Sequence, residues 1–133
     1  MGGGGSLKLS TDRYLKAIIP QAPWYAGFNS FDRITTPTLI IACELDIVAP
    51  VAQHASDFYR DIPNSTAKAF LEINGGDHFC ANSNYPNEDI LGKYGVSWMK
   101  RFIDDDRRFD QFLCGPNHEA DWSISDYRDT CNY

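Results

Sequence analysis

Two of the four cysteines stand beside the side chains best suited to act as an acid and a base. Cys43 precedes Asp46 by three residues, and Cys80 follows His78 by two. A disulfide between these cysteines would pin the carboxylate loop to the imidazole loop. Such a bond requires the two Cα atoms to lie within about 7 Å of each other. It would therefore exclude any fold that separates the two loops.

Short β-branched, apolar runs precede both Asp46 and His78, as is typical of buried strands. Towards the C-terminus, Trp98 and Phe102 recur with the helical period and are expected to face the sheet. The predicted elements are a glycine-rich helix over 1–13, a strand over 14–19, a loop over 21–33, a strand over 34–43, a helix after Pro50, a strand over 67–73, a helix over 87–104 and a short strand over 122–127.

This alternation of strands and helices predicts an α/β fold with a mostly parallel sheet and crossover helices. Neither an internal repeat nor a second domain is evident. In such sheets the catalytic loops gather at the carboxyl ends of the strands. Asp46 and His78 are both in that position, so we expect them to lie at the same edge.

The segment Met1–Ser6 can be read as a flexible linker or cloning scar, or as the start of a helix. A helix is favoured because the glycines run directly into Leu7 and a patterned segment. Each helical glycine costs about 1 kcal/mol relative to alanine. Four in a row therefore call for a reason such as close backbone packing at a tight strand-to-helix turn.

The length and net charge of the chain limit the classes of function that it can have. With 133 residues the chain is long enough for one small domain. Its net charge of −6 opposes binding to nucleic acid or to anionic lipid. No apolar stretch approaches the ~20 residues of a membrane span. Neutral substrates are expected, with neither nucleic acid nor membrane as a partner.

Four cysteines allow three pairings, and the sequence alone does not choose among them. Proximity favours Cys114 with Cys131, and each bond would contribute about 3 to 4 kcal/mol. Disulfides imply an oxidising compartment. The alternative is four reduced thiols in the cytosol. A zinc site is not expected, because no recognised ligand spacing links the nearest candidates, Cys43, His78, Cys80 and His118.

His78 follows two glycines in a loop, where an imidazole can be exposed and can take and return a proton. Asp46 could accept from its other ring nitrogen. The alternative is a surface histidine and a turn aspartate. The remaining polar candidates are expected to be structural or solvated: Glu44, His54, Asp77, Asp104, Asp105, Asp106 and His118. Trp24 suits either the core or the wall of a cleft.

Asp followed by His is the second half of the Ser, Asp, His order of α/β-hydrolases. The chain resembles the C-terminal half of bacterial polyester hydrolases, the cutinase-like enzymes that include PET hydrolase. The segments that carry this resemblance are Gly2–Leu7, Leu15–Ala17, Pro20–Trp24, Pro37–Ile40, Ala42–Glu44 with Asp46, Ala49–Pro50, Phe70–Gly76 with His78, Cys80–Ser83 and Trp98–Phe102.

The resemblance implies a role for each matching residue. Asp46 would be the triad acid and His78 the triad base, and the backbone nitrogen of Met1 would be an oxyanion-hole donor. The matched substrate contacts are Trp24, Val48 and Phe79. The implied disulfides are Cys43–Cys80 and Cys114–Cys131. No cofactor or metal is implied.

One part of the family pattern is missing. The chain has no Gly-x-Ser-x-Gly, and Ser6 is followed by Leu7 and Lys8. We therefore expect the nucleophilic serine to precede Met1, with residues 1–133 forming a partial domain of a secreted, monomeric carboxylic-ester hydrolase that is inactive without it. Neutral esters or polyesters would be the substrates. The alternatives are a lipase of the same fold, a non-catalytic binding module, or a subunit that complements a separate serine-bearing half.

Overall fold

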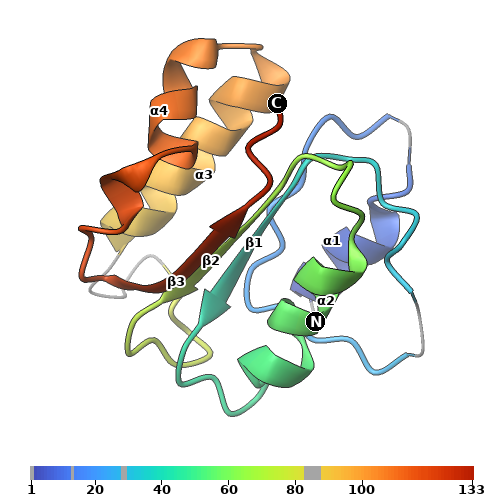
Figure 1. Cartoon of the computed structure of the whole chain (residues 1–133). Helices are drawn as coiled ribbons and strands as arrows, with labels where there is room; N and C mark the ends of the chain where they lie inside the picture. The colour runs from blue at the N-terminus through green and yellow to red at the C-terminus, as the bar shows by residue number, and fades with distance from the viewer. Residues whose placement is uncertain (1, 13, 28–29, 83–87) are drawn as a thin grey trace.

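The computed structural model of the chain describes residues 2–12, 14–27, 30–82 and 88–133 (Figure 1). A sheet with strand order β1-β2-β3 forms its centre. The strands are β1 (Thr38–Cys43), β2 (Lys68–Ile73) and β3 (Ile124–Asp129). The helices are α1 (Gly2–Leu9), α2 (Ala55–Asp61), α3 (Glu88–Ile103) and α4 (Asp110–Leu113), with the 3₁₀ turns η1 (Val51–Gln53), η2 (Arg107–Phe109) and η3 (Pro116–His118).

Strands β1 and β2 are parallel, with Thr38 opposite Lys68 and Cys43 opposite Ile73. The chain between them passes through α2, so this is a strand-helix-strand crossover. Strand β3 runs antiparallel to β2. The predicted α/β class is confirmed, and the sheet has an antiparallel edge strand in addition to its parallel pair.

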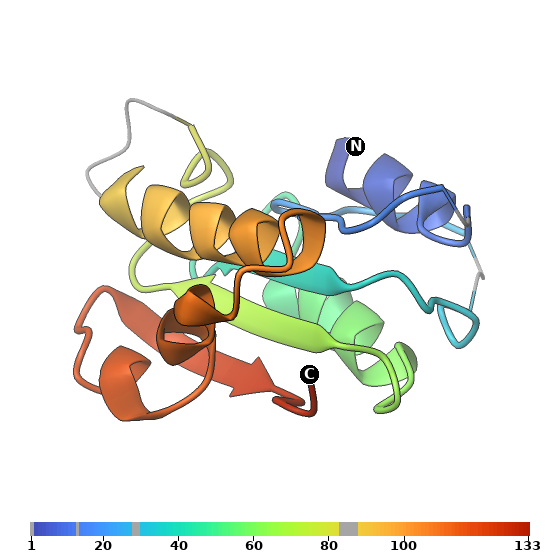
Figure 2. The ribbon, with the colours of Figure 1, turned by 90° about the horizontal axis from the view of Figure 1, so that it is seen from above.

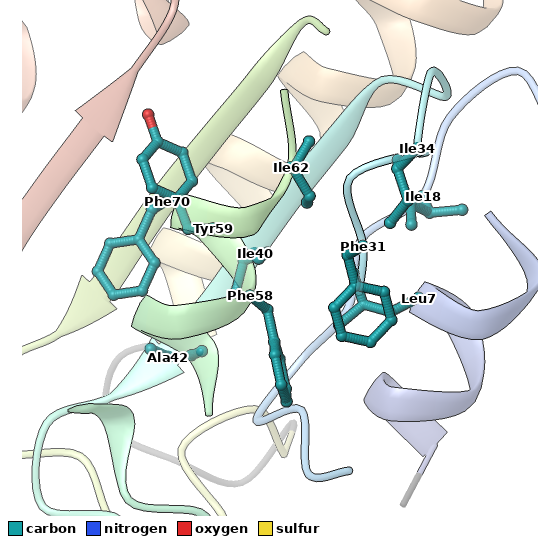
Figure 3. Packing of buried hydrophobic residues seen from close by; sticks show 11 residues of the cluster. Leu7, Ile18, Phe31, Ile34, Ile40, Ala42, Phe58, Tyr59, Ile62 and Phe70 are labelled. Carbon is teal, nitrogen blue, oxygen red and sulfur yellow. The ribbon is translucent and has the colours of Figure 1, made fainter. Parts of the chain in front are cut away.

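Side chains alternate between the two faces of the sheet along each strand. Helices and loops cover both faces. On one face, Ile40 and Phe70 pack with α1, α2 and the segment around Phe31 (Figure 3). On the other, Leu39 and Leu71 pack with residues of α3. Figure 2 shows α3 and α2 on opposite sides of the strands. None of the helices in the described part of the chain is long and apolar enough to cross a membrane.

The helix predicted over 87–104 is confirmed within the described residues as α3. Trp98 is fully buried, and Phe102 is partly buried against the same cluster, as the helical period predicted. Their rings lie 4.5 Å apart between centroids.

The buried strand predicted over 14–19 is wrong. Tyr14 is exposed, and only isolated parallel bridges occur, at Ile18 and Gln21 beside β1. Four backbone hydrogen bonds join residues 18–22 to β1 and to Pro37 before it, including one from the N–H of Ile41 to the carbonyl of Pro20. Pro20 has no N–H to donate, so the pairing of residues 18–22 with β1 is interrupted there.

Three other elements begin or end at residues that differ from the prediction. The first helix ends at Leu9 rather than residue 13, and the strand predicted from residue 34 begins at Thr38. Pro37 accepts a hydrogen bond through its carbonyl but cannot donate one to the ladder. The tail strand covers Ile124–Asp129 rather than 122–127, because the N–H of Ile124 closes a turn onto Asp121.

Close backbone packing, the reason expected for glycines in this helix, is found at two of the four glycines of α1. A Cβ at Gly3 would lie 2.4 Å from the carbonyl oxygen of Gln21, and a Cβ at Gly4 would lie 2.1 Å from that of Trp24. Gly2 and Gly5 have no such neighbour within 4 Å. Close backbone approach therefore explains Gly3 and Gly4, and it holds the Gln21–Trp24 segment against the helix.

Lys68 is buried at the start of β2, where its Nζ donates to the carbonyls of Tyr59 and Ile62 at 2.8 and 2.6 Å. These are end-of-helix carbonyls of α2, which have no partner within the helix. Burial, and to a lesser extent the charge of Arg128, lower the pKa of Lys68.

We expect Lys68→Met to lower the free energy of unfolding by about 2 kcal/mol or more, because both carbonyls would be left buried without a donor. Urea unfolding measures this change. Lys100→Met is the matched control: Lys100 is exposed and its Nζ pairs with Asp104, so its loss should lower the free energy of unfolding by about 0.5 kcal/mol or less. Equal effects of the two substitutions would contradict the capping role.

Candidate active site

The loops that follow β1 and β2 bring the predicted acid and base together. Asp46 lies after β1 and His78 after β2, and the two parallel strands end at the same edge of the sheet. His78 Nδ1 lies 2.7 Å from Asp46 Oδ2. The Asp46 side chain is 1% exposed and that of His78 is 24% exposed. A buried carboxylate thus holds one nitrogen of a partly exposed imidazole.

Backbone groups fix the orientation of Asp46. Its Oδ1 accepts hydrogen bonds from the N–H groups of Val48 at 2.9 Å and Ala49 at 2.7 Å. Both carboxylate oxygens are therefore engaged, one by the loop and one by His78. This arrangement selects the imidazole tautomer that carries its proton on Nδ1, which leaves Nε2 with a free electron pair.

Further bonds join the two loops directly. The N–H of Leu45 donates to the carbonyl of Gly76 at 2.8 Å. Glu44 accepts from the N–H of Gly75 at 2.7 Å, in agreement with the structural role expected for it. Gly75 has a φ of 65°, in the left-handed region that favours glycine.

The disulfides have the pairings that the family resemblance implied. Cys43 is bonded to Cys80, and Cys114 to Cys131. Cys43 and Cys80 are both fully buried, and their Cα atoms lie 6.0 Å apart. The bond ties the end of β1 to the loop of His78. Four reduced thiols and a cysteine-ligated zinc site are both inconsistent with this structure.

The matched substrate contacts lie around the same edge. Phe79 is exposed, and its ring centroid lies 5.8 Å from that of His78. Val48 is exposed in the loop of Asp46. Trp24 is also exposed, and its ring lies 6.0 Å from that of His54. Met1, the expected oxyanion donor, lies outside the described residues.

An open cavity of about 430 Å³ adjoins His78. Gly2 and Gly3, at the start of α1, line it together with His78 and Phe79. The first turn of α1 and the imidazole therefore face a common space. The N–H groups in the first turn of a helix have no partner within the helix, so the first turn of α1 can supply hydrogen-bond donors beside this cavity.

None of the serines that the structure describes donates a hydrogen bond to His78. Ser6 lines the cavity, but its hydroxyl bonds to the carbonyl of Gly2 at 3.2 Å. That Ser6 is not the nucleophile stays a prediction.

Two histidines differ from expectation. His54 and His118, predicted to be solvated, are half-buried. The His118 ring stacks on Tyr127 with 3.9 Å between centroids, and burial lowers its pKa. Neither of them contacts the Asp46–His78 pair in the part of the chain that is described.

The carboxylates outside the pair have local partners. Asp77 is exposed and accepts from the N–H of Phe79, as expected for a loop charge. Asp104 pairs with Lys100, and Asp105 with Arg101, each four residues earlier in α3. Asp106 bonds to Arg108, which lowers its pKa to about 2. The three acidic side chains at this helix end are thus each paired with a nearby cation.

Among the described residues, one group has metal-ligand atoms within reach of one another: Cys114, Asp129 and Cys131. Both sulfur atoms are joined in a disulfide, so they cannot act as thiolate ligands.

Comparison with known proteins agrees with this fold. The model of a family described as PET hydrolase-like matches residues 1–132. The chain belongs to the PET hydrolase-like family. Members of this family are α/β-hydrolases, and the three-stranded sheet with its helices is consistent with part of that fold.

Several curated proteins are similar to the chain, and the chain covers part of the length of each of the three that follow. The chain is 49% identical to Cutinase 1 of Thermobifida cellulosilytica, over 100% of the chain and 50% of that protein. It is 49% identical to a cutinase of Thermobifida fusca, over 100% of the chain and 44% of the relative. It is 44% identical to a bis(hydroxyethyl) terephthalate hydrolase of Streptomyces coelicolor, over 98% of the chain and 41% of the relative. The chain spans about half the length, or less, of these relatives.

Proposed function

We propose that residues 1–133 form the C-terminal half of a secreted hydrolase that cleaves carboxylic esters, with polyesters of the PET or cutin type as substrates. The observation that carries the proposal is the Asp46–His78 pair, joined at 2.7 Å beside an open cavity. The names of the relatives, cutinase and bis(hydroxyethyl) terephthalate hydrolase, support the substrate class. The two disulfides fit an extracellular protein.

In this proposal a serine from a preceding segment is the nucleophile. Its Oγ attacks the ester carbonyl while His78 Nε2 takes the hydroxyl proton. The imidazolium, held by Asp46, then gives that proton to the departing alkoxide, which leaves an acyl-enzyme. Water repeats the sequence: His78 takes its proton, the hydroxyl adds to the acyl carbon, and the serine leaves with the proton returned to it.

A role for Met1, which directly precedes α1 in the sequence, is proposed from the family resemblance alone. The peptide nitrogen of Met1 would donate to the oxyanion that forms on the carbonyl oxygen. Trp24, Val48 and Phe79 would contact the acyl portion of the substrate. Neither a metal nor a cofactor takes part in these steps, and the intact hydrolase is proposed to act as a monomer.

The coding sequence upstream of Met1 tests the proposed missing half. We expect uninterrupted codons that end in Gly-x-Ser. A stop codon or an unrelated sequence within a few codons would contradict the proposal and favour a binding module or a complementing subunit.

The isolated chain and the intact hydrolase should differ sharply in activity. We expect no turnover of a nitrophenyl ester by residues 1–133 alone, because His78 would have no serine to activate and an amino terminus would replace the Met1 amide. Loss of oxyanion donors by itself costs about 3 to 4 kcal/mol of barrier. The intact protein should hydrolyse nitrophenyl esters and bis(hydroxyethyl) terephthalate. Turnover by the isolated chain that is abolished by His78→Ala would instead reveal a second nucleophile.

A further inference from the structure

A loop of the tail lies beside the end of β2, next to the loop that carries His78. It consists of η3 and residues 119–123, and it leads directly into β3 (Figure 1). The Cys114–Cys131 disulfide encloses it. A turn closes it internally, because the N–H of Asp121 donates to the carbonyl of His118 at 3.1 Å. We call residues 116–123 the strap.

Asn74 joins the strap to the loop of His78. Its Nδ2 donates to the carbonyl of Trp122 at 2.8 Å, and its N–H donates to the carbonyl of Ser123 at 2.9 Å. Asn74 directly follows β2 and precedes His78 in the same short loop. A movement of the strap would therefore be passed to the segment that positions His78.

The ring of His118 holds the strap against the sheet. It stacks on Tyr127 of β3, with 3.9 Å between the ring centroids and 28° between the ring planes. Tyr127 is itself fixed, because its hydroxyl donates to the carbonyl of Leu113 at 2.8 Å. The ring of Tyr127 also lies 5.6 Å from that of Tyr94 in α3. The stack thus connects the strap through β3 to the helix on that face.

The surroundings of His118 favour a neutral imidazole. Its Nδ1 is buried and has no hydrogen-bond partner in the described part of the chain. A proton on this nitrogen would place a charged N–H there without an acceptor. The ring of Tyr127 would attract the cation, but the cost of burying a charge is the larger effect. In agreement with this, burial lowers the pKa of His118.

Charged groups approach His118 from three elements. Asp129 of β3 and Glu119 of the strap favour the protonated ring, whereas Lys93 of α3 opposes it. Burial is the largest influence, so the pKa of His118 is lowered on balance. Glu119 and Asp126 also line a cavity of about 330 Å³ beside His118. A polar cavity of this size can hold water, which gives protons a route to the ring.

We propose that the strap is a pH-sensitive brace: neutral His118 holds it against Tyr127, and protonation of His118 releases it and loosens the loop of His78. The stability that the stack provides is present above the pKa of a free histidine, about 6.5, and is lost as the pH falls below that value. The consequence for activity rests on the proposed function. Ester hydrolysis releases a carboxylic acid, so the product would slow the enzyme that forms it.

Thermal unfolding of the intact protein at two pH values tests the brace. His118→Phe keeps a flat ring to stack on Tyr127 but cannot titrate. We expect parent and variant to have the same Tm at about pH 7.5, and the variant to melt about 3 °C or more above the parent at about pH 5, as one buried N–H without an acceptor implies. His118→Gln, which lacks the ring, should lower Tm at both pH values and remove the same pH dependence.

Hydrogen exchange shows where the protein loosens. At about pH 5 the amide of Asn74 should be protected about fivefold less in the parent than in His118→Phe, and at about pH 7.5 the two should agree. His54→Phe is the matched control, because His54 Nδ1 is also buried without a partner among the described residues but precedes α2, outside the strap. It should leave the protection of Asn74 as it is in the parent. Equal pH dependence in the parent and His118→Phe, or exchange in the strap without exchange at Asn74, would overturn the brace.

Activity needs a separate measurement, because His78 must also be neutral to act as a base. For a soluble nitrophenyl ester, we expect the kcat of His118→Phe divided by that of the parent to rise from about 1 at pH 7.5 to about 2 or more at pH 5. A ratio that stays constant would overturn the regulatory role. Failure of the parent to hydrolyse any ester would instead refute the proposed function, and the exchange result would still decide the brace.

Discussion

Replacing His78 with alanine in the intact hydrolase will lower kcat for a soluble nitrophenyl ester by a factor of about 10⁴ to 10⁶. The serine would then have no base to take its proton, and losses of this size accompany removal of the base from a serine triad. Asp46→Asn should cost a factor of about 10⁴, because an amide at this position favours the wrong imidazole tautomer. Steady-state kinetics at neutral pH measure both losses.

A variant that carries both His78→Ala and Asp46→Asn tests whether the two residues act together. Because Asp46 is proposed to act only through His78, combining the two substitutions should cost little more than His78→Ala alone. His118→Ala is the matched control, since His118 is also half-buried but packs on Tyr127. A loss below about tenfold for His78→Ala, or an equal loss for His118→Ala, would refute the assignment.

Removing the Cys43–Cys80 bond will destabilise the protein more than removing Cys114–Cys131. The sequence separations are 37 and 17 residues, and chain-entropy arithmetic converts them to about 4 and about 3 kcal/mol. In an intact protein of roughly twice this length, the first loss corresponds to a fall in Tm of about 10 °C. Paired Cys→Ala variants, compared by calorimetry, measure both effects.

Loss of the two disulfides should also have different effects on activity. Cys80 lies in the loop of His78, so loss of its bond should loosen the Asp46–His78 geometry and lower kcat at temperatures where the variant remains folded. The Cys114–Cys131 bond closes the tail beside β3 and should affect Tm alone. Equal kcat values for the two folded variants would show that the bond near the site serves stability only.

Much of the fold was predictable because it depends on local pattern. The β-branched runs that became β1 and β2 are buried strands, and the helical period of α3 correctly placed Trp98 against the sheet. The meeting of Asp46 with His78 also followed from sequence, since parallel neighbouring strands end at one edge. These features need only the chain order and the period of side chains.

The rest depended on contacts between distant segments. The backbone of β1 pairs with residues 18–22 across Pro20, and the approach of Gln21 and Trp24 to α1 decided which glycines of the helix are closely packed. The half-burial of His118 depends on Tyr127, nine residues away on β3. No local pattern encodes these neighbours, because burial is a property of what packs against a residue rather than of its own segment.

The sequence by itself determined the class of fold, the identity of the acid and base candidates and the cysteines beside them. Only the tertiary structure decided that the strap meets the loop of His78 at Asn74. Strand β3 runs antiparallel to β2, so the start of β3 and the end of β2 coincide only once the sheet has formed. Strand direction is set by non-local hydrogen bonding, which a linear reading of apolar runs does not contain.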